Sequence, residues 1–396
     1  MKTNSIVALT LIIVTACGKK GDGTGATPGL NFENITMQEG TNGVNYARVK
    51  LKLDQATSKQ VTVTYSTAEL TAKAGSDFIA ETNQTVTFAP NETEKDALVS
   101  IVTDDIREAD ETFIVTVQNA QNVNLLKSSV VVTLTNDDTK VPFTNAGTDA
   151  ATSYPGLTLA WSDEFNGTSL NSNDWGYEQG DGCPNVCGWG NNELEYYTAP
   201  PNNVLFQDGK MIIEARAETF GGKNYTSARL KTQGKKTFKF GRVDIRAILP
   251  KGKGIWPAFW LLPQDNVFGG WPKSGEIDLM EYVGSEPTKV LGTLHYGPGP
   301  GSTYISRNYF LTDGTNFNDK FHVYSLEWKQ DQIKWYVDDV LYSTINKTDI
   351  GGNNWPFNEN FFFLINLAVG GNLPGNPDAT TTFPQWLIVD YIRIYQ

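Results

Sequence analysis

Apolar and polar residues alternate with a period of two along most of this chain, which is the pattern of β-strands rather than helices. In the first part the alternating runs are short and rich in Val and Thr, as strands favour. They lie at 47–54, 60–67, 84–90, 97–105, 112–120 and 130–137. In the second part the runs are longer and lie at 239–250, 321–329, 332–342, 361–371 and 387–396. No stretch of the second part has the period of an amphipathic helix. The pattern predicts an all-β protein.

The aromatic residues divide the chain into two modules. All ten Trp residues lie after residue 160, and only two of the sixteen Tyr residues precede residue 150. The first module, at about 30–138, has many short strands separated by Asp, Asn and Gly, and is predicted to be an immunoglobulin-like β-sandwich. The second module, at about 155–396, is predicted to be a large β-jelly-roll sandwich. The polar segment 139–154 between them is predicted to be a linker.

The N-terminus has the pattern of an export signal. A Lys at position 2 precedes an apolar run from Ile6 to Val14, which is too short for a permanent membrane-spanning helix. The letters VTAC at its end resemble a bacterial lipobox, which implies cleavage before Cys17 and acylation of its sulfur. An ordinary signal peptide at 1–17 with an incidental Cys is the alternative. Both interpretations predict export. The lipobox further predicts a bacterial membrane lipoprotein, on the periplasmic side or at the cell surface, held by a flexible tether at 18–29.

Charge and cysteine usage narrow the possible partners. The formal net charge is −12 and no segment is dominated by Lys and Arg, so a nucleic-acid partner is not expected. We expect a monomer. Outside the cytoplasm, Cys183 and Cys187 are predicted to form a disulfide that rigidifies a short turn. A zinc site is not favoured, because the only His residues, His295 and His322, lack metal-ligand spacing.

The acidic segment SGEIDLMEYVG carries the strongest signal of chemistry. Glu276 and Asp278 share one face of a strand, but regular alternation would turn Glu281 to the other face. A one-residue bulge near Leu279 or Met280 would restore the common face. The alternative is an edge strand with its polar residues outward, which explains the alternation but not the slip.

Three carboxyl groups on one surface suit glycoside hydrolysis. Two Glu side chains leaning toward each other could bring their carboxyl groups to about 5.5 Å, the separation that retaining glycosidases use. Neighbouring carboxylates cannot all ionise cheaply, so at least one keeps its proton and its pKa rises. One ionised nucleophile and one protonated acid are the two groups that this reaction needs. From spacing alone, a catalytic strand and a polar edge strand both remain open.

The motifs around the acidic segment resemble those of glycoside hydrolase family 16, in its laminarinase branch acting on β-1,3-glucans. The resemblance runs from WSDEFNG at 161 to the end of the chain, and the matching motifs are GWGNNELEYYT, GKGIWPAFWLLP, LGTLHYGPG and NLAVGGNLPGNPD. It implies a curved jelly roll with an open cleft on its concave face. It also implies that Glu276 is the nucleophile, Glu281 the general acid/base, and Asp278 the residue that holds and tunes Glu276. The extra Met before Glu281 suits the laminarinase branch, because the lichenase branch lacks the bulge.

The expected activity is therefore endo-hydrolysis of β-1,3-glucan by a retaining double displacement, with mixed-linkage β-1,3-1,4-glucan as an additional expected substrate. Two alternatives are open. One is the same fold acting on lichenan or a marine galactan. The other is a cell-surface glucan-binding protein without turnover, although such relatives usually lose the two glutamates that this chain keeps.

Aromatic and polar residues near the acidic segment are candidates for sugar binding, because the C–H face of a pyranose packs on the apolar face of a Trp ring. The predicted substrate-binding residues are Trp256, Trp260, His295, Asn191, Arg229, Trp189 and Glu193. His295 is expected to contact the substrate or Glu281; capping a strand end is its structural alternative, and core packing is the alternative for each Trp. Many relatives have Trp where this chain has Leu373, which predicts weaker binding at one subsite.

The family 16 resemblance also implies a structural, non-catalytic calcium ion. Its expected ligands are Glu164, the backbone carbonyl of Gly209, and Asp390, which would join the first and last strands. Ordinary solvated acids are the alternative.

The first module resembles the Calx-beta family through the letters MQEG, AGSDF, VTDDIREADETFIVTV and TLTNDD. That family binds calcium with acidic loops at one end of the sandwich. The candidate ligands here are Glu39, Asp77, Asp104, Asp105, Glu111 and Asp138. A solvated acidic rim without an ion is the alternative. No catalytic constellation occurs in this module, which is expected to be a spacer or an adhesion unit.

Overall fold

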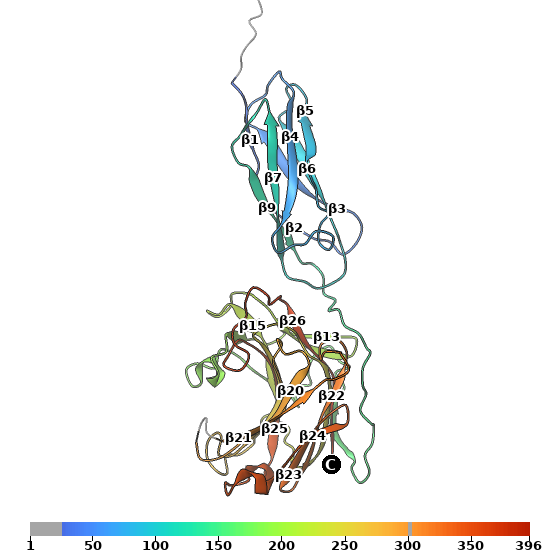
Figure 1. Ribbon diagram of the computed structural model, residues 1–396, viewed down its shortest axis with the longest axis vertical. Coiled ribbons are helices and arrows are strands. Elements are labelled where there is room, and N and C mark those ends of the chain that lie inside the picture. The colour runs from blue at the N-terminus through green and yellow to red at the C-terminus, as the bar shows by residue number, and fades with distance from the viewer. Residues whose placement is uncertain (1–25, 300–302) are drawn as a thin grey trace, which may run out of the picture. The chain divides into compact units, whose positions relative to one another are not determined.

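The computed structural model describes residues 26–299 and 303–396, which divide into two compact units (Figure 1). The N-terminal unit ends at Asp137 and leaves out Asp105–Ala109, which belong with Asp138–Gln396 to the C-terminal unit. The predicted signal peptide, its acylation site and most of the tether lie outside the described residues. Within the described ranges, no helix is long and apolar enough to cross a membrane.

The described part of the N-terminal unit is a sandwich of a four-stranded and a five-stranded sheet. The first has the order β6 (Glu94–Ile101), β3 (Asn45–Leu53), β1 (Gly29–Asn31) and β8 (Asn124–Leu125). The second has the order β2 (Ile35–Gln38), β9 (Ser129–Thr135), β7 (Glu111–Gln121), β4 (Val61–Glu69) and β5 (Gln84–Phe88). Alternate residues of the long strands are buried in one apolar core. The predicted period of two is confirmed.

Two larger sheets form the described part of the C-terminal unit. The eight-stranded sheet has the order β13 (Val204–Gln207), β14 (Lys210–Ala215), β26 (Gln385–Tyr395), β17 (Gly241–Ile248), β22 (His322–Lys329), β23 (Gln332–Val337) and β24 (Val340–Asn346), with β10 (Leu159–Asp163) also pairing with β26. The seven-stranded sheet has the order β11 (Gly176–Glu178), β16 (Arg229–Lys231), β25 (Phe361–Val369), β18 (Ile255–Pro263), β19 (Glu276–Tyr282), β20 (Lys289–His295) and β21 (Tyr304–Phe310).

Short elements complete this unit. Strands β12 (Glu195–Tyr197) and β15 (Tyr225–Ser227) pair with each other. Three 3₁₀ turns, η1 (Cys187–Gly190), η2 (Lys347–Ile350) and η3 (Pro356–Asn358), lie in the described loops.

The two large sheets pack face to face. The ring of Phe259 on β18 lies 6.0 Å from the ring of Tyr324 on β22. Across the same interface, the indole N–H of Trp335 on β23 donates to the carbonyl oxygen of Asp278 on β19, at 2.9 Å. The apolar residues of both inner faces form one core. The predicted sandwich of antiparallel strands is confirmed. The acids of β19 lie on the face of the strand that points away from this core.

The segment 138–154, called the strap below, differs from the expected linker. It belongs to the C-terminal unit and packs on the outer face of the eight-stranded sheet. The Nε of Arg246 donates to the carbonyl oxygen of Thr148 at 2.7 Å, and the hydroxyl of Tyr154 donates to Asp244 at 2.7 Å. Both charged side chains on β17 are buried. Buried charges need partners, and the strap supplies some of them, beside the ion pairs of Asp244 with Arg242 and of Arg246 with Asp390.

Candidate active site

A bulge in β19 brings its acids onto one face. Against β20, Asp278 lies opposite Thr293 and Glu281 lies opposite Leu291, so three steps along β19 match two steps along β20. The hydroxyl of Thr293 donates to Glu281 at 3.3 Å. Because Thr293 lies directly opposite Asp278, this bond places Glu281 on the same face as Asp278. The predicted bulge between these two acids is confirmed.

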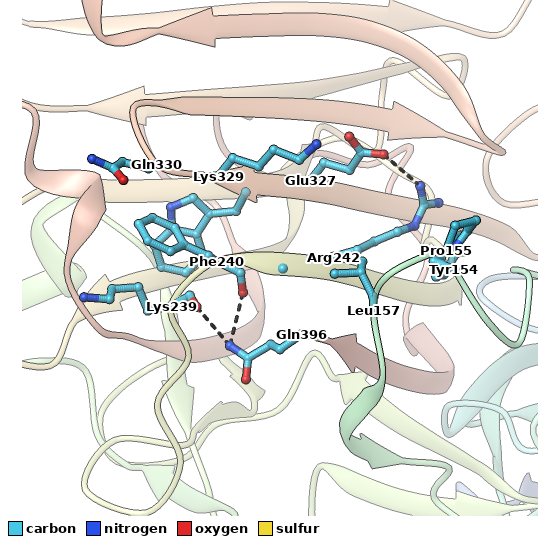
Figure 2. A pocket seen from close by; sticks show the side chains of 12 residues that line it. Tyr154, Pro155, Leu157, Lys239, Phe240, Arg242, Glu327, Lys329, Gln330 and Gln396 are labelled. Carbon is cyan, nitrogen blue, oxygen red and sulfur yellow. Dashed lines mark hydrogen bonds and ion pairs between the residues drawn. The ribbon is translucent and has the colours of Figure 1, made fainter.

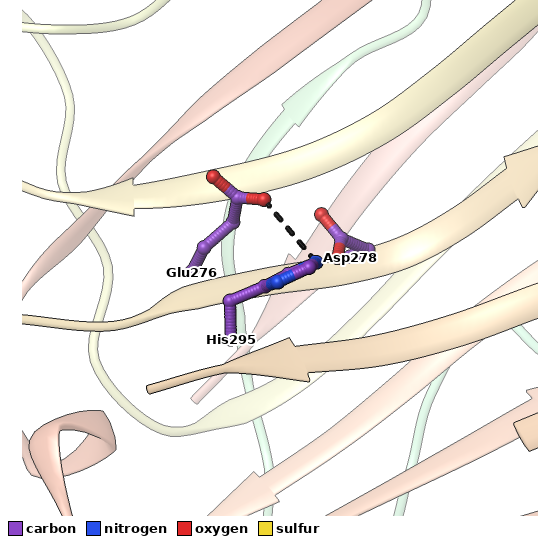
Figure 3. Close-up of side chains that lie close together, drawn as sticks. All are labelled: Glu276, Asp278 and His295. Carbon is purple, nitrogen blue, oxygen red and sulfur yellow. Dashed lines mark ion pairs between the residues drawn. The ribbon is translucent and has the colours of Figure 1, made fainter. Parts of the chain in front are cut away.

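His295 and Trp271 hold the first acid of the strand. The Nε2 of His295 lies 3.6 Å from Oε1 of Glu276 and 3.3 Å from Oδ2 of Asp278 (Figure 3). The indole N–H of Trp271 donates to Oε2 of Glu276 at 2.9 Å. We expected His295 to contact the substrate or Glu281. In the structure it lies against Glu276 and Asp278 rather than Glu281, because antiparallel pairing sets His295 opposite Glu276, at the other end of β19. Its contact with the substrate stays a prediction.

Burial raises the pKa of all three acids. For Glu276, burial and the charge of Asp278 raise the pKa to about 8, against the lowering effects of His295 and Trp271. Burial and the charge of Glu281 raise the pKa of Asp278 well above its usual value. Burial also raises the pKa of Glu281. The group therefore keeps at least one proton at neutral pH. A proton on Asp278, which is 3% exposed, removes the charge that after burial raises the pKa of Glu276 most, and so favours ionisation of Glu276.

Three of the predicted sugar-binding residues form a stack. The guanidinium carbon of Arg229 lies 4.4 Å from the ring centroid of Trp189 and 4.8 Å from that of Trp260. Glu178 pairs with Arg229 at 2.6 Å and keeps the guanidinium between the two rings. The indole of Trp256 lies close enough to Glu281 to lower the pKa of that carboxyl. Trp256 and Trp260 on β18 are both half-buried. Neither is a fully buried core residue, which was the alternative interpretation.

Glu193 is placed differently from the prediction of direct sugar contact. It is 5% exposed. Its Oε1 accepts a hydrogen bond from the Asn191 amide at 3.2 Å, and its Oε2 accepts one from the Tyr197 hydroxyl at 3.1 Å. With both oxygens engaged beneath the surface, Glu193 supports its neighbours. Asn191 remains half-buried, and its contact with a sugar hydroxyl stays a prediction.

The predicted disulfide is present and shapes this rim. Cys183 and Cys187 are bonded, and the second cysteine begins η1, which contains Trp189. Trp189 adopts the left-handed backbone conformation, with φ of 50°. That conformation is unfavourable for a residue with a β-carbon. The disulfide closes the loop just before Trp189 and so restricts the backbone that leads into it.

Sequence reasoning missed Trp271. Its side chain is 48% exposed and lies in the loop before β19, with its N–H on Glu276. The letters WPKSGE place a Trp five residues before the acid, and that proximity was the available signal. A loop has no fixed period, so proximity alone does not show which way a side chain points.

The residues predicted to bind structural calcium have basic partners. Arg393 donates to both carboxylate oxygens of Glu164, at 2.9 and 2.7 Å. Asp390 pairs with Lys210 at 2.9 Å and with Arg246. The two side chains, as arranged, offer no uncommitted oxygen to a cation. The expected ion at Glu164, Gly209 and Asp390 does not fit this arrangement, and we derive no step from it.

The acids of the first module are only partly grouped. Asp77 and Glu111 bring carboxylate oxygens within 4.8 Å of each other, a spacing that suits a shared cation. Asp105 instead pairs with Lys140 at 2.8 Å. Calcium binding by this module stays a prediction.

A pocket of about 510 Å³ lies away from the acids of β19, among residues of β17 and β22 and the end of the strap (Figure 2). On its wall, Arg242 pairs with Asp244 at 2.8 Å and with Glu327 at 3.7 Å. We assign it no catalytic part, because it belongs to the other sheet.

Comparison with known proteins identifies the family. The sequence pattern of Glycosyl hydrolases family 16 matches residues 193–383, which include β19 and β20. A beta-glucanase from Rhodothermus marinus is 41% identical over 263 residues, which cover 63% of this chain and 89% of that protein. The chain belongs to glycosyl hydrolase family 16. Its C-terminal unit is accordingly a family 16 jelly roll, and a glycoside hydrolase.

Two further likenesses concern this family 16 unit. The glucan endo-1,3-beta-glucosidase A1 of Niallia circulans is 42% identical over 269 residues; the chain spans 39% of that protein's length. The crystal structure of the laminarinase catalytic domain from Thermotoga maritima shares 44% identity with a TM-score of 0.58, covering 61% of this chain and 98% of that one.

The N-terminal unit of this family 16 protein matches another family. Residues 26–139 match the Calx-beta domain, as the resemblance predicted. Residues 96–268 also match the pattern of the beta-glucan synthesis-associated protein SKN1/KRE6/Sbg1.

Proposed function

We propose that this chain is an endo-β-1,3-glucanase that hydrolyses laminarin-type glucans by a retaining double displacement. The observation that carries the proposal is the bulged strand β19, which presents Glu276, Asp278 and Glu281 on one face of a family 16 jelly roll. The named activities of the similar proteins support β-1,3-glucan as the substrate class. A mixed-linkage β-1,3-1,4-glucan is a second substrate of the same chemistry.

In the first step, ionised Glu276 attacks the anomeric carbon and forms a covalent glycosyl-enzyme. Protonated Glu281 gives its proton to the glycosidic oxygen, so the bond to the leaving sugar breaks. The hydrogen bond from Trp271 fixes Oε2 of Glu276. Asp278 assists by holding a proton beside Glu276, which lets Glu276 carry the negative charge that attack requires.

In the second step, Glu281 is ionised and takes a proton from water. The resulting hydroxide attacks the anomeric carbon from the face that the leaving sugar occupied, and Glu276 is released. Two inversions at one carbon retain its configuration. The burial that raises the pKa of Glu281 favours its starting, protonated form.

The residues around the acids are proposed to bind the glucan. Trp256 and Trp260 present half-buried rings on β18, and Asn191 and the Arg229 stack lie at one rim of the same sheet. Trp271 adds an exposed ring beside Glu276. Leu373 is 42% exposed and offers no aromatic ring to a sugar, in line with the weaker subsite that we predict.

The deciding experiment assays the full chain on laminarin, lichenan and agarose, with Glu276→Gln and Glu281→Gln as matched, uncharged variants. We expect reducing sugar from laminarin, and a loss of about 10⁴-fold or more in kcat for each variant. Unchanged sugar release by Glu276→Gln would refute the assignment of the nucleophile. Products from lichenan alone or agarose alone would remove the laminarin assignment. Glucan binding without any turnover would favour a surface binding protein.

We also propose that the protein is exported and anchored by a lipid on Cys17. The lipobox-like letters before that residue support this. Labelling cells with a radioactive fatty acid is expected to mark the wild type and not Cys17→Ser. Equal labelling of both proteins would contradict the anchor.

A further inference from the structure

A pair of buried carboxyl groups lies outside the mechanism. Glu193 is 5% exposed and Glu195, on β12, is 0% exposed. The two side chains share a hydrogen bond. A carboxylate only accepts hydrogen bonds, so two carboxyl groups can share one only if one of them carries a proton.

The contacts identify Glu195 as the group with the proton. Burial raises the pKa of Glu193 as well, but the positive charge of Arg229 and the hydrogen bonds from Asn191 and Tyr197 stabilise its anionic form. Glu195 accepts one hydrogen bond at Oε2, from the backbone N–H of Val369 at 2.7 Å. Its Oε1 accepts none from the described residues. Burial and the charge of Glu193 raise the pKa of Glu195 well above its usual value.

A chain of hydrogen bonds leads from this pair to the sugar-binding face. The hydroxyl of Tyr197 donates to Glu193 and accepts from the side-chain amide of Asn366, at 3.1 Å in each case. The side-chain oxygen of Asn366 accepts from the indole N–H of Trp260 at 2.7 Å. Each group has one orientation that satisfies both neighbours. The indole N–H can only donate and the ionised Glu193 can only accept, so every bond between them has a fixed direction. The proton on Glu195 keeps Glu193 in place at the end of this chain.

We propose that Glu195 is a positioning residue for glucan binding: as a neutral acid it donates its proton to Glu193, which then orients Asn191 and, through Tyr197 and Asn366, Trp260. This inference rests on the proposed function, since the contact of Asn191 and Trp260 with a glucan belongs to it. Glu195 itself is fully buried and touches no substrate.

The arrangement predicts a pH effect on binding rather than on chemistry. The titratable and charged groups facing the pair are Tyr197 and Arg229, with Glu178 paired to Arg229 behind it. Loss of the shared proton at high pH would leave two adjacent buried anions and one cation. The pair would separate, Asn191 and Trp260 would lose their fixed positions, and KM would rise with pH. The acids of β19 set kcat separately.

The test compares Glu195→Gln with Glu195→Leu in the full chain. The Gln amide donates to Glu193 and its oxygen accepts from Val369, so every bond is kept without a titrating proton. We expect Glu195→Gln to hold the wild-type KM on laminarin within about twofold near pH 6, and to lose the alkaline rise of KM. Glu195→Leu lacks the donor, and we expect its KM to rise about tenfold with kcat within about threefold.

Two results would overturn the proposal. One is an equal rise of KM in Glu195→Gln and Glu195→Leu; the other is an alkaline KM profile of Glu195→Gln that matches the wild type. If Glu195→Leu does not fold, the Gln profile still decides. Difference infrared spectroscopy supplies a readout that needs no activity, because Glu195→Gln should remove a protonated-carboxyl band of the wild type. A wild type inactive on β-1,3-glucan but with that band would refute the proposed function and leave the proton pair intact.

Discussion

At the scale of single residues, the behaviour of Glu276 depends on opposing neighbours. Burial and the charge of Asp278 raise its pKa, whereas His295 and the N–H of Trp271 lower it. Removing a neighbour that lowers the pKa of Glu276 should move the pH profile of activity to higher pH, and removing one that raises it should move the profile to lower pH. Each neighbour can therefore be tested by the direction of the shift. The direction tests the physical cause more sharply than a loss of activity, which many substitutions produce.

His295→Gln removes the imidazole whose electrostatic effect lowers the pKa of Glu276 and Glu281. Without it both pKa values rise, so ionising the nucleophile and deprotonating the acid each need a higher pH. We expect both limbs of the bell-shaped profile of kcat/KM to move toward higher pH, with the greatest loss of activity on the acidic side. A profile that shifts toward lower pH would contradict the placement of His295 beside the acids.

Trp271→Phe keeps an exposed aromatic ring but removes the hydrogen bond to Glu276. A hydrogen bond to a charged group contributes about 1.5–3 kcal/mol, so kcat/KM on laminarin is expected to fall about tenfold or more at acidic pH. The loss should shrink as pH rises, because Glu276 then ionises without the donor. A loss that is the same at every pH would instead indicate that the indole acts through sugar packing.

At the scale of elements, the catalytic strand depends on loops that pack against its sheet. Gly371 follows β25, and a β-carbon there would lie 3.2 Å from the carbonyl oxygen of Asn191 and 3.3 Å from the ring of Trp256. Its φ of +112° is also unfavourable for other residues. This glycine thus lets the loop after β25 close on the turn that carries Asn191.

Gly371→Ala is predicted to raise KM on laminarin about threefold to tenfold and to lower stability by about 1–3 kcal/mol. Gly375→Ala is the matched control in the same loop, because its φ is also positive but nothing lies within 4 Å of the added carbon. Thermal unfolding and KM should both change more for Gly371→Ala. Equal changes in the two variants would show that backbone strain, and not the close approach, is responsible.

At the scale of the whole molecule, the family 16 unit begins earlier in the chain than composition indicates. Val141 of the strap is 1% exposed and packs with Ile212 and Phe321. The strap also supplies one hydrogen-bond partner each to Arg246 and Asp244. Polar composition indicated a linker, but these residues complete one face of the domain.

A chain that starts at residue 155 is therefore predicted to be less stable than one that starts at residue 138. Removing the strap takes the Tyr154 hydroxyl from Asp244 and the Thr148 carbonyl from Arg246, although the ion pairs with Arg242 and Asp390 remain, and it exposes the apolar surface that Val141 covers; together these losses amount to about 3 kcal/mol. For a domain of this size the unfolding midpoint should fall by about 10 °C, measured by calorimetry at one pH and salt concentration. Equal midpoints for the two chains would mean that the strap is a linker after all.

The candidate site was predictable from sequence wherever the signal was local and periodic. The alternation at β19 and its slip before Glu281 placed three acids on one face, and the structure has that bulge. The pairing of Cys183 with Cys187 was likewise local. Where two distant segments had to meet, the sequence did not show the partners: Glu164 and Asp390 were expected at a calcium ion, and in the structure each has a basic partner.

The sequence by itself determined the all-β class, the two modules and the bulged acidic strand, because these follow from period, composition and spacing along the chain. The family and the catalytic role of the strand followed from the resemblance of its motifs to those of family 16. Only the tertiary structure decided that Glu193 is buried on Glu195, that Trp271 reaches Glu276, and that the strap is part of the domain. Burial and hydrogen-bond partners depend on which distant segments pack together. The sequence shows that a residue has a carboxyl group, but not whether that group is exposed or buried. Its charge depends on that environment and on the partners that it contacts there.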